Sequence, residues 1–184
     1  MPRLFIGIQI SDSQHIKKIQ EDLKELLFKS HIKWVEPENF HITLKFLGEV
    51  SSYTIEPLIQ VLEHITKNYN KFSLNSKGLG IFGPAKKPHA IYYGFQENSL
   101  LKSMQRSIEK SLSELGFEIG EKGFSPHLTI GRVKSLFEKE KLFQVLQIKD
   151  GNSFTFEISK FQLIKSDLTQ EGPNYKVIKS FELN

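Results

Sequence analysis

The sequence predicts an α+β fold made of two similar lobes. Segments with the apolar spacing of helices and segments with the alternation of strands are interleaved along all 184 residues. In addition, His41-Ile42-Thr43-Leu44 recurs 86 residues later as His127-Leu128-Thr129-Ile130. This spacing is nearly half the chain, which is too long for a solenoid repeat. We therefore expect two lobes related by a pseudo-twofold axis.

Four helices are predicted from apolar residues at helical spacing, over residues 12–29, 55–65, 101–115 and 142–146. Ser11 to Gln14 has the pattern of a capping box at the start of the first helix. Pro57 is placed in the first turn of the second helix, where a missing N–H is tolerated. Gly116 is expected to end the third.

Strands are predicted where apolar and polar residues alternate or an apolar run is short, at 5–10, 40–47, 71–82, 89–96, 127–134, 153–164 and 175–182. Neither a linker nor a low-complexity tract divides the chain. We expect residues 1–184 to form a single bilobal domain.

Composition excludes several classes of site. The chain has no cysteine, which excludes disulfides, thiolate zinc sites, iron–sulfur clusters and a cysteine nucleophile. The first ten residues are too short an apolar run for a secretory signal, and no stretch approaches the roughly 18 apolar residues of a membrane span. We expect a cytoplasmic protein with no membrane partner. The net charge of +4 and pI near 9.1 suit a polyanionic partner without identifying one.

The two copies of the motif place like residues on like faces. Side chains alternate along a strand, so His41 and Thr43 share one face while Leu44 and Phe46 share the apolar face. In the second copy, His127 and Thr129 likewise share one face, and Leu128 and Ile130 share the apolar face. Lys45 falls on the face of His41, where it would either reach a phosphate or remain solvated. If the lobes face each other, two imidazoles and two hydroxyls meet.

Two imidazoles suit the cleavage of a phosphodiester. A neutral imidazole can take a proton from water while an imidazolium protonates the departing alkoxide, and each role is worth about 10² to 10⁴ in rate. Histidine populates both protonation states near neutral pH. Threonine hydroxyls and a cation can hold the other phosphate oxygens. This scheme requires no metal and no cofactor.

The sequence resembles the two-histidine phosphoesterases, and among them the RNA 2′,3′-cyclic phosphodiesterases, also called 2′-5′ RNA ligases. The signature is His-x-Thr-x with apolar x, present twice. Further blocks resemble the family in order along the chain: 3–6, 33–41, 46–50, 78–82, 91–94, 124–127 and 172–175. Gly131 and Tyr92 depart from the family, which usually has Ala and Trp there.

The resemblance implies antiparallel sheets flanking a central cleft, with helices outside. It implies hydrolysis of a terminal 2′,3′-cyclic phosphate on RNA to a 2′-phosphate, with no metal or nucleotide cofactor. By position His127 would be the base and His41 the acid, although the pseudo-symmetry permits the exchange. Thr43 and Thr129 would bind phosphate. Partners would be RNA ends, tRNA fragments among them, or small cyclic nucleotides, and the protein would be a monomer.

Other functions remain open alongside this one. The same site could carry out 2′-5′ ligation, the same chemistry in reverse, or the protein could bind RNA ends without turnover.

The family also has a phosphate-binding arginine at the position of Arg132. Strand parity alone puts Arg132 on the apolar face, but a bulge or an end of regular pairing at Gly131 would turn it back toward the cleft. The alternative is that Arg132 is a solvated strand end. Tyr92 is a candidate for stacking on a base or ribose.

The segment Gly78 to Gly83 matches the G-x-G-x-x-G pattern of dinucleotide-binding folds. That pattern requires a helix to follow, whereas Pro84 to Pro88 come next, so we interpret it as part of a β-hairpin. Lys86 and Lys87 at its tip could contact a nucleic acid backbone. Trp34 is expected to pack rather than to stack on substrate.

Overall fold

The computed structural model describes the chain except for residues 11, 121–122, 148–153 and 169–172. In the described residues the helices are α1 (Gln14–Leu26), α2 (Ser52–Thr66), α3 (Ser99–Ser113) and α4 (Lys139–Gln147), with one 3-10 turn at Pro37–Asn39. The strands are β1 (Arg3–Gln9), β2 (His31–Trp34), β3 (His41–Glu49), β4 (Phe72–Phe82), β5 (Ala90–Phe95), β6 (His127–Ser135), β7 (Thr155–Ile158), β8 (Lys160–Leu168) and β9 (Pro173–Glu182). The predicted α+β class is confirmed.

The strand order places the two histidine strands at the centre. It runs β7-β4-β5-β6-β3-β1-β8-β9, with β2 added to β6, and every pair is antiparallel. Between β3 and β6 a single residue pair, Ile42 with Leu128, joins the two sets of strands. The antiparallel sheets of the two predicted lobes are thus present as the two halves of one continuous sheet.

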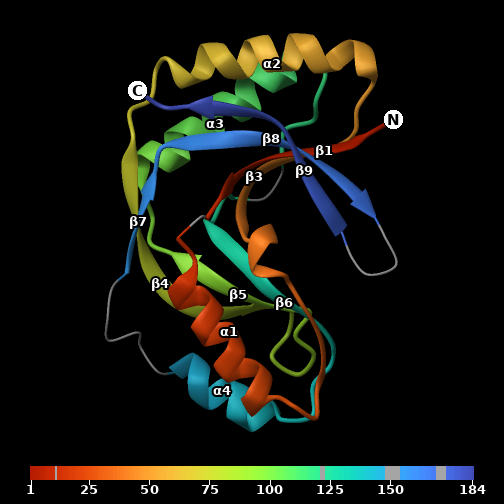
Figure 1. Cartoon of the computed structure of the whole chain (residues 1–184), viewed down its shortest axis with the longest axis vertical. Coiled ribbons are helices and arrows are strands. Elements are labelled where there is room, and N and C mark those ends of the chain that lie inside the picture. Colours follow the sequence, from red (N-terminus) through yellow and green to blue (C-terminus); the bar gives the residue numbers. More distant parts are fainter. Residues whose placement is uncertain (11, 121–122, 148–153, 169–172) are drawn as a thin grey trace.

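Each half of the sheet has its own pair of helices (Figure 1). The first half, which contains His41, is β3, β1, β8 and β9, with α2 and α3 packed on it. The second half, which contains His127, is β6, β5, β4 and β7 together with β2, α1 and α4. Although α1 follows β1 in the sequence, it lies on the second half. The chain thus crosses between halves, and neither half is a contiguous segment.

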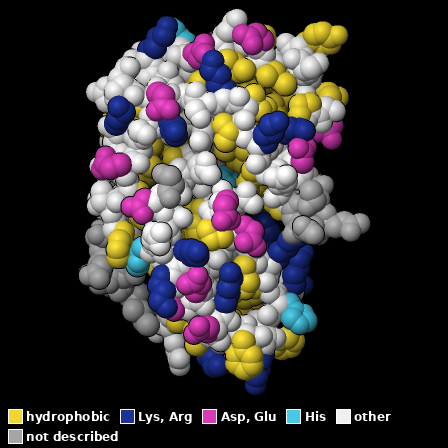
Figure 2. All heavy atoms as spheres, in the orientation of Figure 1, with side chains coloured by type: hydrophobic (Ala, Val, Ile, Leu, Met, Phe, Trp, Pro, Cys, Tyr) yellow, Lys and Arg dark blue, Asp and Glu magenta, His cyan; other side chains and the backbone are white. Residues whose placement is uncertain are grey.

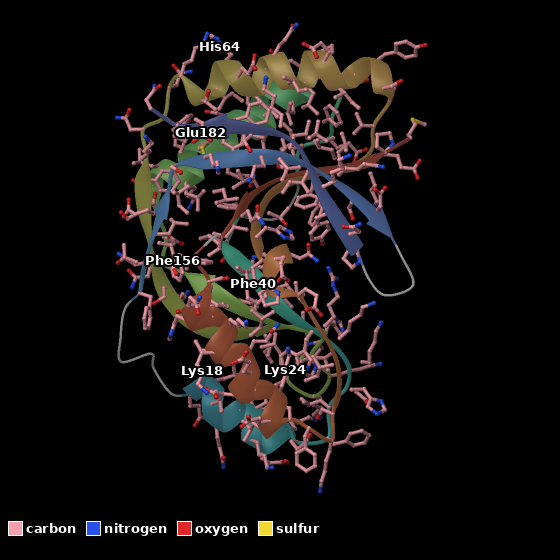
Figure 3. The ribbon with its side chains drawn as sticks, viewed as in Figure 1. Lys18, Lys24, Phe40, His64, Phe156 and Glu182 are labelled. Carbon is pink, nitrogen blue, oxygen red and sulfur yellow. The ribbon has the colours of Figure 1, made fainter. Side chains whose placement is uncertain are left out.

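The core lies between the sheet and these helices. Ile42, Leu44, Leu128 and Ile130 are at most 3% exposed, so the apolar face of both motifs is fully buried as predicted. Phe40, labelled at the centre of Figure 3, is also completely buried directly before His41. Burial of this row fixes the strand register, because a slip by one residue would bring the histidines into the core.

Two predicted helix starts are corrected. Helix α1 begins at Gln14 with Ser13 as its N-cap and no side-chain cap, so the capping box does not form as predicted, and its Ser11 lies outside the described residues. Helix α2 begins at Ser52, where the Ser51 side chain accepts a hydrogen bond from the Tyr53 N–H. Pro57 consequently lies in the second turn, where its ring removes one intrahelical hydrogen bond.

The strand predictions miss two features. The segment at 153–164 divides into β7 and β8, because Ser159 ends one pairing with β4 and the next residue begins pairing with β9. Its first residue lies outside the described residues. Strand β2 is not predicted at all. Its polar–apolar alternation spans only four residues, too few to distinguish a strand from a loop, and its pairing partner β6 is about a hundred residues away.

Candidate active site

The two motifs lie on one face of the sheet. Ile42 and Leu128 are opposite each other in the antiparallel pair, so they share the buried face. Because neighbours along a strand alternate, His41, Thr43, His127 and Thr129 all lie on the other face. We call this surface the histidine face. All four residues are partly exposed.

Both imidazoles are held in the same way. The Nδ1 atom of His41 lies 2.7 Å from the carbonyl oxygen of Asn39, and Nδ1 of His127 lies 2.8 Å from that of Ser125. A carbonyl only accepts hydrogen bonds, so each Nδ1 carries a proton. In the neutral ring Nε2 is then unprotonated and available to substrate. In both cases the carbonyl belongs to the second residue before the histidine, at the turn that opens the strand.

Aromatic rings flank each imidazole. The ring centroid of His41 is 4.7 Å from that of Phe5 and 5.1 Å from that of Tyr175. His127 is 4.7 Å from Phe82 and 5.6 Å from Tyr92. These contacts restrict both imidazoles to one orientation.

The sequence-predicted Tyr92 therefore does reach the histidine face. Its ring lies across Gly80, the residue opposite it on β4, and a Cβ at Gly80 would come within 2.3 Å of that ring. This close approach explains one glycine of the G-x-G-x-x-G match. The β4–β5 pairing also confirms that the segment belongs to a β-hairpin.

Arg132 turns toward the histidine face through a β-bulge. Tyr92 pairs with Thr129 and Ile91 with Gly131, so Ile130 is the extra residue in β6. Ile130 and Gly131 are both buried, and Arg132 is exposed on the side of His127 and Thr129. The predicted bulge is thus present. Among the described residues Arg132 forms no ion pair, so its guanidinium remains available.

The same kind of bulge occurs in β3, where strict alternation predicts none. Gly7 pairs with Thr43 and Ile6 with Lys45, which leaves Leu44 as the extra residue. Lys45 is consequently buried behind the sheet and Phe46 lies on the histidine face, 74% exposed. Both positions are opposite to the predictions from strict alternation. Phe46 is the counterpart of Arg132, five residues after its histidine.

Lys45 is thereby removed from the candidate site. Its ammonium group lies 2.5 Å from a Glu109 carboxylate oxygen and 2.6 Å from the carbonyl of Glu118. The Lys45 side chain is 4% exposed and that of Glu109 is 15% exposed. A lysine enclosed in this way has a structural role and cannot contact a phosphate on the opposite face.

In the second half a glycine occupies the position of Lys45. A Cβ at Gly131 would come within 2.9 Å of Ile32 and 3.0 Å of Trp34, both on β2. Trp34 therefore packs against the bulge, as predicted, and fills the space that the lysine occupies in the first half. An alanine at this position would require the Ile32 or Trp34 side chain to shift.

The charges on the histidine face affect one another. Burial lowers the pKa of His41 below its ordinary value of 6.5, and the positive charges of Arg132 and His127 lower it further, against the hydrogen bond to Asn39. Burial raises the pKa of Tyr175, while the charge of Arg132 opposes that shift. The charge of Arg132 thus acts on groups of the other half of the sheet.

Other histidines, and the lysines of the hairpin loop, lie away from the histidine face. His64, labelled in Figure 3, is on the outer side of α2, far from both motifs. The ring of His15 stacks on that of Phe154, with the two ring centroids 3.4 Å apart. Lys86 and Lys87 are exposed in the loop between β4 and β5. Within the described ranges no three His, Cys, Asp or Glu side chains are grouped closely enough to bind a metal ion, and no described helix is long and apolar enough to cross a membrane.

Comparison with known proteins identifies the family. The model of the LigT-like phosphoesterases matches residues 8–92 and 96–175. The chain belongs to the LigT-like phosphoesterase family. Both His-Thr motifs and all the flanking aromatic residues named above except Phe5 lie within the matched ranges.

Relatives of this LigT-like protein cover its whole length. An RNA 2′,3′-cyclic phosphodiesterase of Methanocaldococcus jannaschii is 38% identical over 97% of this chain and 99% of its own. An RNA 2′,3′-cyclic phosphodiesterase of Archaeoglobus fulgidus is 35% identical over 98% of this chain and 99% of its own. Among solved structures, TT0787 of Thermus thermophilus superposes with a TM-score of 0.79 at 20% identity, covering 98% and 97%. Escherichia coli LigT complexed with 3′-AMP gives 0.75 at 21% identity, covering 100% and 98%.

Proposed function

We propose that this protein hydrolyses 2′,3′-cyclic phosphate ends of RNA to 2′-phosphates, with the histidine face as its active site in a single bilobal domain. The observation that carries the proposal is the pair of imidazoles held on one face with both Nε2 atoms available. The names of the full-length relatives support the reaction. The finer points, that it acts as a monomer in the cytoplasm, are part of the proposal.

Each of the two histidines carries out one of the two proton transfers. One Nε2 takes a proton from water, whose oxygen bonds to phosphorus, while the other Nε2 gives a proton to the departing O3′, which becomes the 3′-hydroxyl. We assign the first role to His127 and the second to His41. The lowered pKa of His41 disfavours its protonated form in the free protein. A bound phosphate anion next to the ring opposes that shift, which ties protonation of the acid to substrate binding.

Phosphate is held by the remaining polar groups of the histidine face. In the described structure neither the Thr43 nor the Thr129 hydroxyl has a hydrogen-bond partner, so both can donate to phosphate oxygens. The Arg132 guanidinium supplies the positive charge for the oxygens that become more negative in the transition state. Phe46 and Tyr92 offer aromatic surfaces on the two halves, where a base or ribose can stack.

An RNA strand fits this surface better than a mononucleotide. Lys33 is the cross-strand partner of Arg132, and both are exposed on the same side of the sheet. Basic side chains gather on the flank of the second half in Figure 2. A backbone that continues beyond the reacting phosphate would meet these cations. RNA ends, such as those of tRNA fragments, would therefore bind more tightly than a small cyclic nucleotide.

Product analysis tests the proposal directly. A short RNA with a 2′,3′-cyclic phosphate end is incubated with the protein in EDTA, and the products are separated together with 2′- and 3′-phosphate standards. We expect the 2′-phosphate alone, at a lower KM for the oligonucleotide than for a cyclic mononucleotide. A second reaction contains RNA with a free 5′-hydroxyl, so that a 2′-5′ linkage would reveal ligation. Binding without any product would show an RNA-end binding module and overturn the proposal.

A further inference from the structure

Two buried glutamines contact the two bulges. Gln20 on α1 is completely buried, and its Nε2 donates to the carbonyl oxygens of Ile130, at 2.9 Å, and Val35, at 2.7 Å. Gln105 on α3 is 8% exposed, and its Nε2 lies 3.4 Å from the carbonyl of Leu44. Ile130 and Leu44 are the extra residues of the two bulges. The contact is therefore repeated in the two halves.

The two helices repeat the pattern in sequence as well. Each glutamine lies on the buried stripe of its helix, with an apolar residue four positions before it and another three positions after it: Ile16 and Leu23 around Gln20, Leu101 and Ile108 around Gln105. An apolar side chain would suit such a stripe better, because burying an amide costs free energy unless it is hydrogen-bonded. A polar residue at both equivalent positions thus indicates a shared task.

The effect of a bulge on its strand explains that task. The extra residue disrupts the regular ladder with the neighbouring strand. The Ile130 carbonyl accepts from the Val35 N–H at 3.0 Å, and Gln20 adds a second donor to it while also binding the Val35 carbonyl. A donor from the helix behind stabilises the bulged form of the strand relative to the regular one. In the regular form Arg132 would return to the buried face with Ile130, and Phe46 with Leu44, as strict alternation predicts.

We propose that Gln20 and Gln105 are positioning residues that hold the two bulges, Gln20 so that Arg132 reaches the phosphate and Gln105 so that Phe46 lines the substrate surface. This inference rests on the proposed function for its kinetic consequences. Its structural consequence, the position of Arg132 on the histidine face, does not depend on catalysis. The two glutamines act through different residues, which makes each the control for the other.

Double-mutant cycles test the proposal. Gln20→Met and Gln105→Met keep the length of the side chain and remove its donor. We expect Gln20→Met to lower kcat/KM about tenfold, and this loss to disappear in an Arg132→Ala background, as coupling through one residue requires. In a Phe46→Ala background the same loss should remain in full. Gln105→Met should show the reverse pattern, with the loss mainly in KM.

The pKa of His41 gives a readout without turnover. Arg132 lowers the pKa of His41, so displacement of Arg132 by Gln20→Met should raise it, as Arg132→Ala should, whereas Gln105→Met should leave it unchanged. NMR titration of the imidazole measures it. If Gln20→Met does not fold, Gln20→Asn, which keeps the amide but shortens its reach, replaces it in both experiments.

The outcomes separate the inference from the proposed function. A wild-type protein with no turnover overturns the function, and the titration still decides the positioning of Arg132. A wild-type protein that turns over, with Gln20→Met costing the same factor with and without Arg132, overturns the inference. That result would mean that the glutamine stabilises the fold and nothing more.

Discussion

The two halves of the sheet have the same framework around each histidine but differ in the two residues beyond the bulge. Both have a carbonyl-held imidazole, a threonine two residues later, a bulge after the threonine and a buried glutamine behind the bulge. The first half then has Lys45 and Phe46, and the second has Gly131 and Arg132. Under the proposed function, the halves share the residues that transfer protons and differ in the residues that contact the rest of the substrate.

This contrast shows how a nearly symmetric frame serves an asymmetric reaction. A cyclic phosphate presents an attacking water on one side and a leaving oxygen attached to a nucleoside on the other. Proton transfer needs an imidazole on each side, so both motifs are retained. One cation suffices for the phosphate, and an aromatic surface suits a base or ribose, so the equivalent positions have diverged into Arg132 and Phe46.

The largest expected effect removes the shared feature. His41→Ala and His127→Ala should each lower kcat by about 10² to 10⁴, because each deletes one of the two proton transfers. Both side chains are partly exposed, so thermal unfolding should change little. Steady-state kinetics on a cyclic-phosphate RNA measures the loss. Near-wild-type turnover by either variant would exclude that histidine from the mechanism.

A smaller effect is expected where the halves differ. Arg132→Ala should lower kcat/KM about 10- to 100-fold by removing the charge that stabilises the transition state, and Arg132→Lys should recover part of it. Phe46→Ala at the matching position is the control, and it should raise KM with little change in kcat. Equal losses in kcat for both variants would contradict the division of roles between the halves.

The shared features are accessible from sequence because they depend on local alternation. The repeat of His41 to Leu44 at His127 to Ile130 predicts both the face of the histidines and the buried row behind them. Helix spacing predicts α3 and α4 nearly to their ends. The assignment of α1 to the second half is not predictable, because hydrophobic spacing shows which helix face is buried but not against which strands.

The bulges show where such reasoning fails. Strict alternation places both Lys45 and Phe46 on the wrong face, because one extra residue in β3 reverses the parity of the residues after it. The bulge is stabilised by Gln105, about sixty residues away, together with the pocket for Lys45 near Glu109. One local signal does exist, since aligning the two motifs puts Phe46 at the position of Arg132, where Gly131 already indicates a bulge.

Charge coupling between the halves gives a third prediction. Arg132→Ala should raise the pKa of His41, because removing a nearby positive charge stabilises the imidazolium. An NMR titration of His41 over about pH 4 to 9 in the two proteins measures the shift. Lys33→Ala, which removes an exposed charge from the neighbouring strand, serves as the control and should shift it less. An unchanged pKa in Arg132→Ala would mean that the guanidinium points away from the histidine face.

The smallest effect on activity is expected at Lys45, the counterpart of Gly131. Lys45→Met should leave kcat and KM within about twofold, since the ammonium group lies behind the sheet. It should lower the free energy of unfolding by on the order of 2 kcal/mol, because Glu109 then keeps a partly buried carboxylate without its cation. Urea unfolding and kinetics on the same sample measure both quantities.

Lys33→Met is the matched control, because it removes an exposed lysine on the side of Arg132. Lys33→Met should leave the free energy of unfolding unchanged but raise KM for RNA, and this increase should be larger at low salt concentration than at high. If instead Lys45→Met raised KM and left unfolding untouched, the bulge in β3 would not persist in solution. Lys45 would then lie beside His41, and the two halves would differ in strand geometry as well as in side chains.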